Sequence, residues 1–304
     1  MGYLAAFATL ICWTIATYVF AFAARKASPA SVNRVRLLYA ALALSIICCF
    51  LFGLNPIELF TNISAEQYLW FGISGFIGLT LGDYFAFSAF KILGNRRTSL
   101  FSCFAPGAAF IGASLLLNEP ITLQGILGML ISVAGILILV LSRKEKANVN
   151  QEGHGNFMVG VLFGILGAVG QGVGLVFAKK GFEVSAPNFH PIYATWVRML
   201  IASITVYLIG AFKVNLWQEF KDISFNKSIN KQVLLGTLFG PMIGISFSLY
   251  AATHLEAGIA QTIFSMLPIT VLIAAVIWFK EKINPISYLA VGISLAGVLI
   301  LVWR

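Results

Sequence analysis

The chain has 304 residues, of which 59% are hydrophobic and only 10% are charged, and its formal net charge is +9. Ordinary soluble domains contain about 25% charged and about 45–50% apolar residues. A chain this apolar could not cover a water-exposed surface, which excludes a cytosolic enzyme, a secreted disulfide scaffold and a disordered protein. The composition predicts an all-α integral membrane protein with many transmembrane helices.

Ten apolar runs follow one another along the chain, and each is long enough for one helical crossing of about 20 residues. They span residues 3–24, 35–54, 68–90, 98–117, 121–142, 157–179, 191–212, 232–253, 257–279 and 284–303. Two polar stretches interrupt this pattern. Residues 143–156 are expected to form a flexible hinge, and residues 213–231 a surface loop.

The two halves of the chain carry one sequence pattern at a fixed spacing. Placing AGILILVLSR on AGVLILVWR sets Gly135 on Gly297, an offset of 162 residues. The same offset, without a gap, pairs charged, proline, serine and glycine residues: Arg36 with Arg198, Glu119 with Glu281, Pro106 with Pro268, Ser132 with Ser294, Gly78 with Gly240 and Gly82 with Gly244. This spacing predicts an internal duplication, with five spans in residues 1–142 and five in residues 157–304.

An odd number of spans in each copy has a physical consequence. After five crossings the second copy enters the membrane from the opposite face, so the copies are expected to be inverted repeats. Such repeats are related by a pseudo-twofold axis in the membrane plane, and secondary transporters bind their substrates near the midplane between them. The predicted fold is therefore ten transmembrane helices in two inverted five-helix repeats around a central cavity.

The run GDYFAFSAFKILGNRRTSLFSCFAPGAAFIGASLLLNEPITLQGILGMLISVAGILILVLSRK resembles the EamA-type domain of the drug/metabolite transporter superfamily. In that family the fourth span carries a proline and ends in a glutamate, and the fifth ends in a glycine-apolar run. The matching residues in the two copies are Pro106, Glu119 and Gly135, and Pro268, Glu281 and Gly297. The resemblance implies a ten-helix basket with cytoplasmic termini and a cavity lined mainly by spans 1, 3, 4, 6, 8 and 9.

Asp83 is the only acidic residue well inside an apolar run. A charge at that depth costs about 2.5–3.5 kcal/mol on insertion scales, so the side chain should face protein or water. One hypothesis is a proton-coupling or substrate-amine site. The other is a structural carboxylate paired with Lys91 or with a base of another span. The counterpart of Asp83 in the second half is Ile245, so a duplicated role is not expected.

Two arginines occupy equivalent positions in the halves, Arg36 and Arg198. Either could hold a substrate carboxylate or phosphate with a bidentate fork. The alternative, favoured for Arg36, is that the side chain extends to lipid head groups or caps a neighbouring helix. Glu119 and Glu281 lie at span ends and are predicted to be gating or loop-anchoring residues.

Proline and glycine residues mark the spans that are expected to bend or to pack closely. Pro106 and Pro268, with Pro241, should kink their spans. Span 6 is rich in glycine, which allows close helix contact, and Gln171 lies among these glycines as a candidate polar ligand. Aromatic and hydroxyl side chains complete the predicted substrate site: Trp13, Thr17, Tyr84, Phe247, Tyr250 and Ser265. For each of these, ordinary helix packing is the alternative.

The sequence offers no machinery for catalysis. The three histidines, His154, His190 and His254, lie in or near connections without a cysteine or carboxylate at metal-ligand spacing. No nucleophile–base pair or nucleotide-binding motif is visible. We therefore predict no metal, no cofactor and no enzymatic activity.

The basic residues are distributed unevenly between the two sides of the predicted membrane. The connections between spans 1–2, 3–4, 5–6, 7–8 and 9–10 contain 16 of the 20 Lys and Arg residues. Because short basic connections face the cytoplasm, this bias places both termini outside, against the family resemblance, and the orientation stays open. These bases are expected to contact anionic lipid head groups and not nucleic acid.

Together these features predict a secondary active transporter that exports a small metabolite such as an amino acid by alternating access. Its expected partners are a small-molecule substrate and the lipid bilayer of a bacterial inner (plasma) membrane; the oligomeric state is left undefined. Two alternatives remain. A sugar-phosphate or nucleotide-sugar antiporter should bring several bases together, whereas a non-transporting membrane assembly protein would support a partner complex without any flux.

Overall fold

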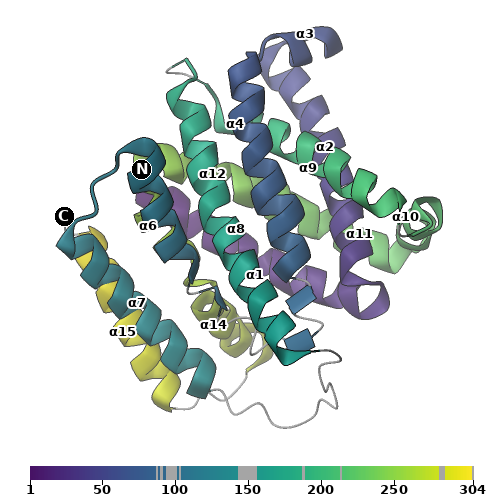
Figure 1. Cartoon of the computed structure of the whole chain (residues 1–304). Helices are drawn as coiled ribbons and strands as arrows, with labels where there is room; N and C mark the ends of the chain where they lie inside the picture. The colour runs from purple at the N-terminus through teal and green to yellow at the C-terminus, as the bar shows by residue number, and fades with distance from the viewer. Residues whose placement is uncertain are drawn as a thin grey trace. The chain divides into compact units, whose positions relative to one another are not determined.

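The computed structural model describes residues 1–86, 88–89, 92–93, 101–102, 104–142, 156–186, 189–212, 214–280 and 285–302. Every regular element in these residues is helical, which confirms the all-α prediction for this part of the chain (Figure 1). The elements are α1 (Gly2–Lys26), α2 (Pro29–Phe52), α3 (Pro56–Thr61), α4 (Ala65–Gly75), η1 (Phe76–Gly82), α6 (Phe104–Leu117), α7 (Leu123–Ser142), α8 (Phe157–Glu183), α9 (Pro191–Ala211), α10 (Leu216–Ser224), α11 (Lys227–Thr237), η2 (Leu238–Gly244), α12 (Ile245–His254), α13 (Ala257–Phe264), α14 (Leu267–Phe279) and α15 (Pro285–Val302). The predicted hinge lies outside the described residues, apart from Asn156.

Long apolar helices dominate the described chain. Seven helical segments are long and apolar enough to cross a membrane: Gly2–Phe20, Ala30–Phe52, Ala65–Ala86, Phe157–Glu183, Pro191–Ala211, Lys227–His254 and Ala257–Trp278. Three shorter apolar helices, Phe104–Leu117, Leu123–Ile138 and Tyr288–Leu301, lie where spans 4, 5 and 10 are predicted. The ten-span count itself stays a prediction.

Helix α2 begins at Pro29, before the start predicted at residue 35. The Ser28 hydroxyl accepts a hydrogen bond from the Ser31 amide at 3.1 Å, and a proline at the first position suits a helix start because it has no N–H to satisfy. The helix ends at Phe52 and is capped by Gly53, whose φ of 64° is readily adopted by glycine. Arg36 therefore lies within a helix, where its Nε donates to Asn33 Oδ1 at 2.7 Å.

The prediction of a surface loop over residues 213–231 was wrong, because this stretch contains α10 and the start of α11. Asn215 caps α10 by accepting from the Gln218 amide at 3.1 Å, and Asn226 caps α11 in the same way. The stretch reads as polar because its outer face is polar. Its inner face carries Ile223, which is buried in the core of unit 1.

The described residues form two compact units. Unit 1 comprises Met1–Leu81 and Phe177–His254, and unit 2 comprises Gly82–Val176 and Leu255–Arg304. Each unit therefore combines segments of both predicted repeats.

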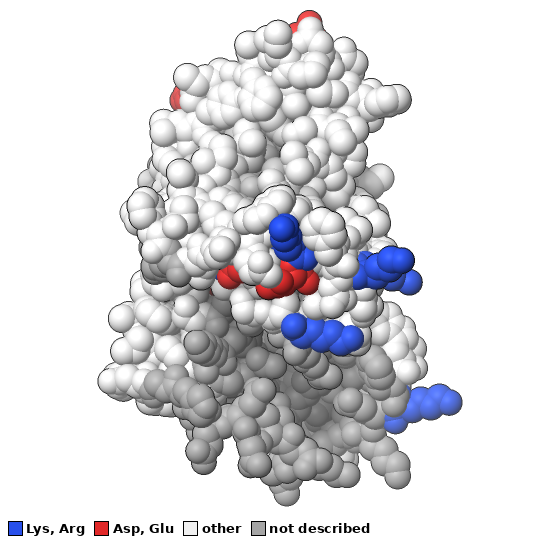
Figure 2. Space-filling model, turned by 90° about the vertical axis from the view of Figure 1, so that its right-hand side faces the viewer, with Lys and Arg blue, Asp and Glu red and all other residues white. Residues whose placement is uncertain are grey.

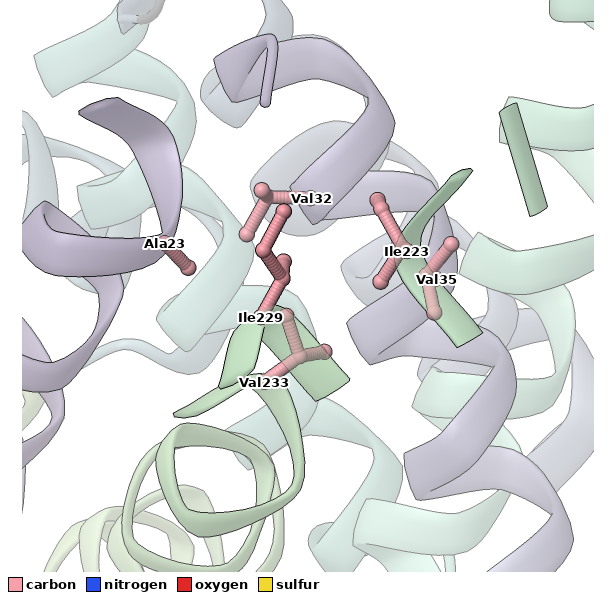
Figure 3. Packing of buried hydrophobic residues seen from close by; sticks show 6 residues of the cluster. All are labelled: Ala23, Val32, Val35, Ile223, Ile229 and Val233. Atoms are coloured by element: carbon pink, nitrogen blue, oxygen red, sulfur yellow. The ribbon is translucent and has the colours of Figure 1, made fainter. Parts of the chain in front are cut away.

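In unit 1, helices α1, α2, α10 and α11 meet around a buried apolar cluster (Figure 3). Its members are Ala23, Val32, Val35, Ile223, Ile229 and Val233. At its edge the Tyr39 hydroxyl lies 2.7 Å from Ser224 Oγ and 3.0 Å from Asn230 Oδ1. Apolar burial and these polar contacts together hold the short helix α10 against α2 and α11.

Helices α2 and α9, the second helix of each predicted repeat, pack antiparallel in unit 1. Trp196 Nε1 donates to Ser45 Oγ at 2.7 Å, while the Phe52 ring stacks on Tyr193 at a centroid distance of 5.6 Å. Residues near the end of α2 therefore contact residues near the start of α9, as in an antiparallel pair. Both helices begin with a proline, Pro29 and Pro191, at positions related by the 162-residue spacing.

In unit 2, α7 and α15 lie side by side and exchange matched contacts (Figure 1). Ser132 Oγ donates to the Ser294 carbonyl at 3.1 Å, and Ser294 Oγ donates to the Ser132 carbonyl at 3.1 Å. A Cβ atom added at Gly135 would overlap the Ser294 backbone and side chain, and one at Gly297 would overlap Ser132 in the same way. Glycine is therefore needed at both crossing points.

Backbone irregularities recur at the same 162-residue spacing. The π-helical segment η1 covers Phe76–Gly82, and η2 covers Leu238–Gly244. The two non-glycine residues with positive φ in the described chain, Asn118 (54°) and Lys280 (53°), are also equivalent. π-helical segments such as η1 and η2 are rare and frequently lie at functional sites.

Candidate functional site

Arg198 on α9 is the one Lys, Arg, Asp or Glu side chain that is buried within the described residues, with 6% exposure. One turn before it, the Thr195 hydroxyl accepts from Ser246 Oγ of α12 at 3.2 Å. One turn after it, the Ala202 carbonyl accepts from the Thr80 hydroxyl of η1 at 3.3 Å. Residues at this spacing share one helix face, so the face of Arg198 contacts both α12 and η1.

A single glycine allows this close arrangement. A Cβ atom added at Gly75 would lie 2.5 Å from the carbonyl oxygen of Arg198 and 3.0 Å from its Cα. Any side chain at position 75 would therefore force α4 and α9 apart. The buried guanidinium is suited to an anionic group because it can donate two parallel hydrogen bonds.

Four other predicted site residues lie in unit 1, on α1 and α12. Trp13 packs against the end of η2, where a Cβ atom at Gly244 would lie 2.6 Å from the indole Nε1. The Thr17 hydroxyl donates to the Trp13 carbonyl at 2.7 Å. On α12, the Tyr250 ring stacks on His254 at a centroid distance of 4.3 Å, and Phe247 is exposed. Thr17 and Tyr250 thus make these contacts within their own helices.

In unit 2, the structure brings together two candidates that are 88 residues apart in the chain. Gln171 Nε2 of α8 donates to Asp83 Oδ1 at 3.0 Å in a partly buried position. Asp83 directly follows η1. The Gln171 amide therefore holds one carboxyl oxygen of Asp83. Lys91, the alternative partner predicted for Asp83, lies outside the described residues.

The glycines of α8 explain how the pair forms. A Cβ atom at Gly167 would lie 3.0 Å from the Ala86 amide nitrogen and 3.2 Å from the Gly82 carbonyl oxygen. The two backbones therefore pass close together one turn before Gln171, which places the amide within reach of Asp83. The glycine content of this span is visible in the sequence, but the helix that it contacts is not.

Tyr84 and Ser265 also belong to unit 2. The Tyr84 ring is exposed and lies 5.6 Å from Phe85 and 6.4 Å from Phe163, measured between centroids. Ser265 is buried, and its hydroxyl lies 2.9 Å from the Gln261 carbonyl oxygen and 3.4 Å from that of Ser102.

Glu119 joins the end of one span to the start of another. It follows Asn118, and its Oε2 accepts from the amide of Ala257, the first residue of α13, at 2.9 Å. The residue before that helix, Glu256, makes no capping bond with its own side chain, so Glu119 supplies a distant cap. Glu281, its counterpart, lies outside the described residues.

The prolines mark helix boundaries within predicted spans. Span 9 is divided into α13 and α14, with Pro268 at the second position of α14. Pro106 is the third residue of α6. The N–H groups in the first turn of a helix have no partner within that helix, and proline has no N–H. A proline is therefore well suited to the first turn, where α6 and α14 place Pro106 and Pro268.

Sequence reasoning missed the hydroxyl residues around Arg198, namely Thr80, Thr195 and Ser246. Thr195 could have been found from its spacing of three residues before Arg198, whereas the other two lie on different helices. Of the histidines, His190 caps α9 and His254 stacks on Tyr250, and His154 lies outside the described residues. Within the described chain, no group of three or more His, Cys, Asp or Glu residues could hold a metal ion.

Comparison with known proteins identifies the chain's relatives. The profile of the EamA-like transporter family matches residues 1–141 and 158–303. Protein PagO of Salmonella typhimurium (strain LT2) is 27% identical over 121 residues, which cover 39% of this chain and 38% of PagO. A solved crystal structure of another protein superposes with a TM-score of 0.74 at 16% identity, covering 99% of this chain and 96% of its own, which shows a shared fold.

Long apolar helices together with this profile match define an integral, multi-pass membrane protein of the transporter class. Because the profile covers nearly all of both halves, the chain belongs to the EamA-like transporter family. The resemblance seen in the sequence is therefore confirmed.

Proposed function

We propose that this protein is a secondary active transporter that exports a small amphipathic metabolite, such as an amino acid, by alternating access. The membrane would be a bacterial inner membrane, which the likeness to a Salmonella protein supports. The observation that carries the proposal is the Asp83–Gln171 pair directly after a π-helical segment.

Alternating access requires two halves that can exchange conformations, and local contacts support ten spans in two inverted repeats. Equivalent helices run antiparallel in each unit, α2 with α9 and α7 with α15. The Ser132–Ser294 contacts are reciprocal at the repeat spacing, as a twofold axis between α7 and α15 requires. Inverted repeats of this kind are found in many secondary transporters.

The two π-helical segments are suitable bending points. Their hydrogen bonds depart from the α-helical pattern, and insertions into that pattern are a common cause of helix bending. Because η1 and η2 occupy equivalent positions, bending at both would preserve the symmetry between the two conformations.

Asp83 is proposed to carry the coupling proton. Its carboxyl group is partly buried, lies next to one bending point and has a neutral hydrogen-bond donor in Gln171. A neutral donor allows the carboxyl group to gain and lose a proton more easily than a fixed cation would. In unit 1, Arg198 is proposed to bind the carboxylate of the substrate.

The charge pattern favours an amino acid over a sugar phosphate. A phosphate site is expected to contain several converging bases, and Arg198 is the single buried base among the described residues. No nucleic acid partner is expected.

The test is transport by purified protein in sealed vesicles, with single solutes of several classes and with or without an imposed pH gradient. Asp83→Asn should abolish gradient-driven flux of an amino acid and leave exchange down a substrate gradient intact. The matched control is Asp222→Asn on α10, which makes the same change at an exposed carboxylate and should alter neither flux.

Other results of this experiment would contradict the proposal, and each would favour a different role for the protein or for Asp83. Unchanged gradient-driven flux in Asp83→Asn would remove this residue from coupling, and loss of folded protein would indicate a structural carboxylate. Flux of phosphorylated sugars alone would favour the antiporter, and no flux of any solute class would favour the assembly protein.

A further inference from the structure

Four exposed lysines gather where α1, α10 and α11 meet in unit 1, and we call this region the basic corner: Lys26, Lys221, Lys227 and Lys231. Lys26 Nζ lies 3.5 Å from Ser228 Oγ, next to Lys227, and Lys227 and Lys231 are one helical turn apart. Figure 2 shows several basic and acidic side chains close together near the middle of the view, with single charged residues elsewhere on the same face. Most of the described surface above that region is uncharged.

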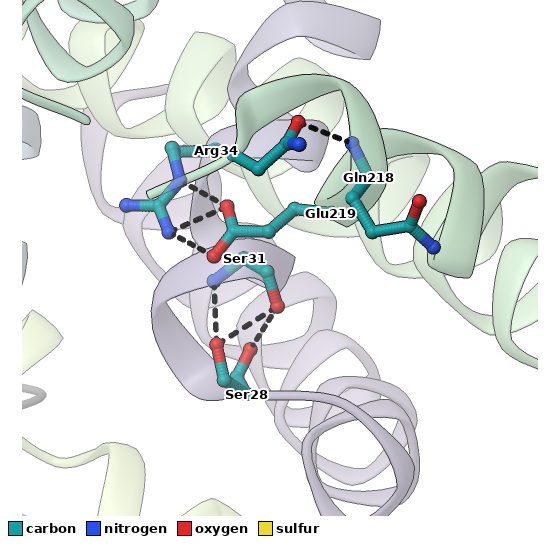
Figure 4. A network of polar contacts seen from close by, with 6 residues as sticks. Ser28, Ser31, Arg34, Gln218 and Glu219 are labelled. Carbon is teal, nitrogen blue, oxygen red and sulfur yellow. Dashed lines mark hydrogen bonds and ion pairs between the residues drawn. The ribbon is translucent and has the colours of Figure 1, made fainter. Parts of the chain in front are cut away.

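The acidic residues of α10 do not cancel this positive charge. Glu219 is engaged by Arg34, whose Nε and Nη2 donate to its two oxygens at 2.8 and 2.7 Å (Figure 4). This bidentate pair is largely buried and neutralises Glu219 within the protein. Asp222 accepts from Gln218 Nε2 at 2.7 Å and is the one exposed acid on α10. The outer surface therefore carries a net positive charge.

The basic corner is fixed to the helices beneath it. Ile223 is buried in the cluster of Figure 3, and Ser224 bonds to Tyr39. The Arg34–Glu219 pair connects the first turn of α10 to α2. The lysines of α10 and α11 are thus presented from an ordered surface, which reduces the entropy lost when a ligand binds.

Three large, exposed aromatic side chains lie on the stretch of chain between residues 212 and 225 that also carries Lys221. Phe212 is 89% exposed, Trp217 is 63% exposed and Phe225 is 76% exposed. Lys221 Nζ lies 5.0 Å from the centroid of the Trp217 ring. A short amphipathic helix such as α10, with Lys221 and the exposed Trp217 on its outer side, is typical of a segment at the membrane–water interface.

A ligand for this surface must satisfy two conditions at once. It must carry negative charge for the lysines and apolar chains for the aromatic rings. Free phosphate lacks the second feature, whereas an anionic phospholipid has both, with its phosphate close to its acyl chains. Basic residues beside membrane-spanning helices bind anionic lipids in this way.

We propose that the basic corner is a binding site for an anionic phospholipid head group, with Lys221, Lys227 and Lys231 as its main cationic contacts. The acyl chains lie against Trp217, Phe212 and Phe225. This site shares no residue with the Asp83–Gln171 pair and does not depend on the substrate that the protein transports.

The proposal can be tested with purified protein in neutral detergent, using dioctanoyl phosphatidylglycerol and dioctanoyl phosphatidylcholine as probes and native mass spectrometry to count bound lipid. Wild-type protein should retain the anionic lipid in preference to the zwitterionic one. The triple variant Lys221→Gln, Lys227→Gln, Lys231→Gln should lose this preference, by about fivefold for each lysine removed. Inorganic phosphate at millimolar concentration should not displace the lipid.

A matched control removes the same charge elsewhere, in Lys179→Gln, Lys180→Gln, Lys280→Gln, and should keep the preference. An equal loss of lipid preference in the control variant would show a general charge effect and would overturn the proposal. Displacement of the lipid by phosphate would also overturn it, and so would equal retention of the two lipids by wild-type protein. The melting temperature of both variants without added lipid should match that of the wild type. If the triple variant unfolds, Trp217→Ala replaces it and should weaken retention of phosphatidylglycerol; unchanged retention in Trp217→Ala would overturn the proposal.

Discussion

The two π-helical segments have the same backbone form at equivalent positions, but they are followed by different chemistry. After η1 comes Asp83, which accepts a hydrogen bond from Gln171. After η2 comes Ile245, and the residue equivalent to Gln171 is Thr9, whose buried hydroxyl donates to the Ala5 carbonyl at 2.9 Å. The π-helical segment therefore occurs twice at the 162-residue spacing, and the ionisable group after it occurs once.

The residues that lead into and form these segments differ as well. Gly75 precedes η1, and its equivalent before η2 is Thr237, whose hydroxyl donates to the Val233 carbonyl at 2.7 Å. Pro241 lies inside η2, whereas η1 contains no proline. Since both segments form, the π-helical geometry follows from the packing of each span and not from one residue type.

The largest effect is expected from moving the carboxylate between the copies. The double variant Asp83→Asn, Ile245→Asp should show no gradient-driven flux in sealed vesicles, because position 245 lacks an equivalent of the Gln171 donor. The Ile245→Asp single variant tests whether the new charge is tolerated. Restored flux in the double variant would show that the two copies are chemically interchangeable.

A side chain should be tolerated far less well at Gly75, just before η1, than at a glycine with open space around it. Gly75→Leu places a side chain against the Arg198 backbone and should reduce the free energy of unfolding by about 3 kcal/mol. Gly292→Leu is the matched control, because a Cβ atom there has no neighbour within 4 Å. Reversible unfolding in mixed micelles measures both, and equal stability of the two variants would contradict the close crossing of α4 and α9.

The Gln171–Asp83 hydrogen bond should contribute more to the free energy of unfolding than the Thr9–Ala5 hydrogen bond at the equivalent position. Gln171→Leu leaves Asp83 without this donor and should cost about 1.5–3 kcal/mol, whereas Thr9→Val removes a neutral bond and should cost about 0.5–1.5 kcal/mol. The same unfolding measurement compares them. A larger loss in Thr9→Val would mean that the Asp83–Gln171 bond adds little to the fold.

The smallest effect is expected at the proline of η2. Pro241→Ala should change the free energy of unfolding by less than about 1 kcal/mol and leave flux intact, because η1 forms its π-helical turns without proline. A crystal structure of the variant should still contain the segment. Conversion of residues 238–244 to regular α-helix would show that proline is its cause.

Several site residues could be named from the sequence, but their contacts could not. Asp83 stands out as an acid within an apolar run, and Gln171 as a polar residue among glycines, yet 88 residues separate them. The link depends on the close approach of Gly167 to the backbone at Gly82 and Ala86. Arg198 was found through the repeat, while Thr80 and Ser246 reach its helix face from other parts of the chain.

The sequence by itself determined the apolar, helical character of the chain and the 162-residue spacing at which similar residues recur, because each follows from local composition or from a fixed spacing. Only the tertiary structure decided which polar groups meet, that residues 216–224 form a helix, and that both copies contain a π-helical segment. Apolar periodicity is a property of one helix alone, and it carries little information on neighbours in a chain where nearly every face is apolar. Buried hydrogen bonds and close glycine crossings depend on two helices at once, so they appear only when the packing is known.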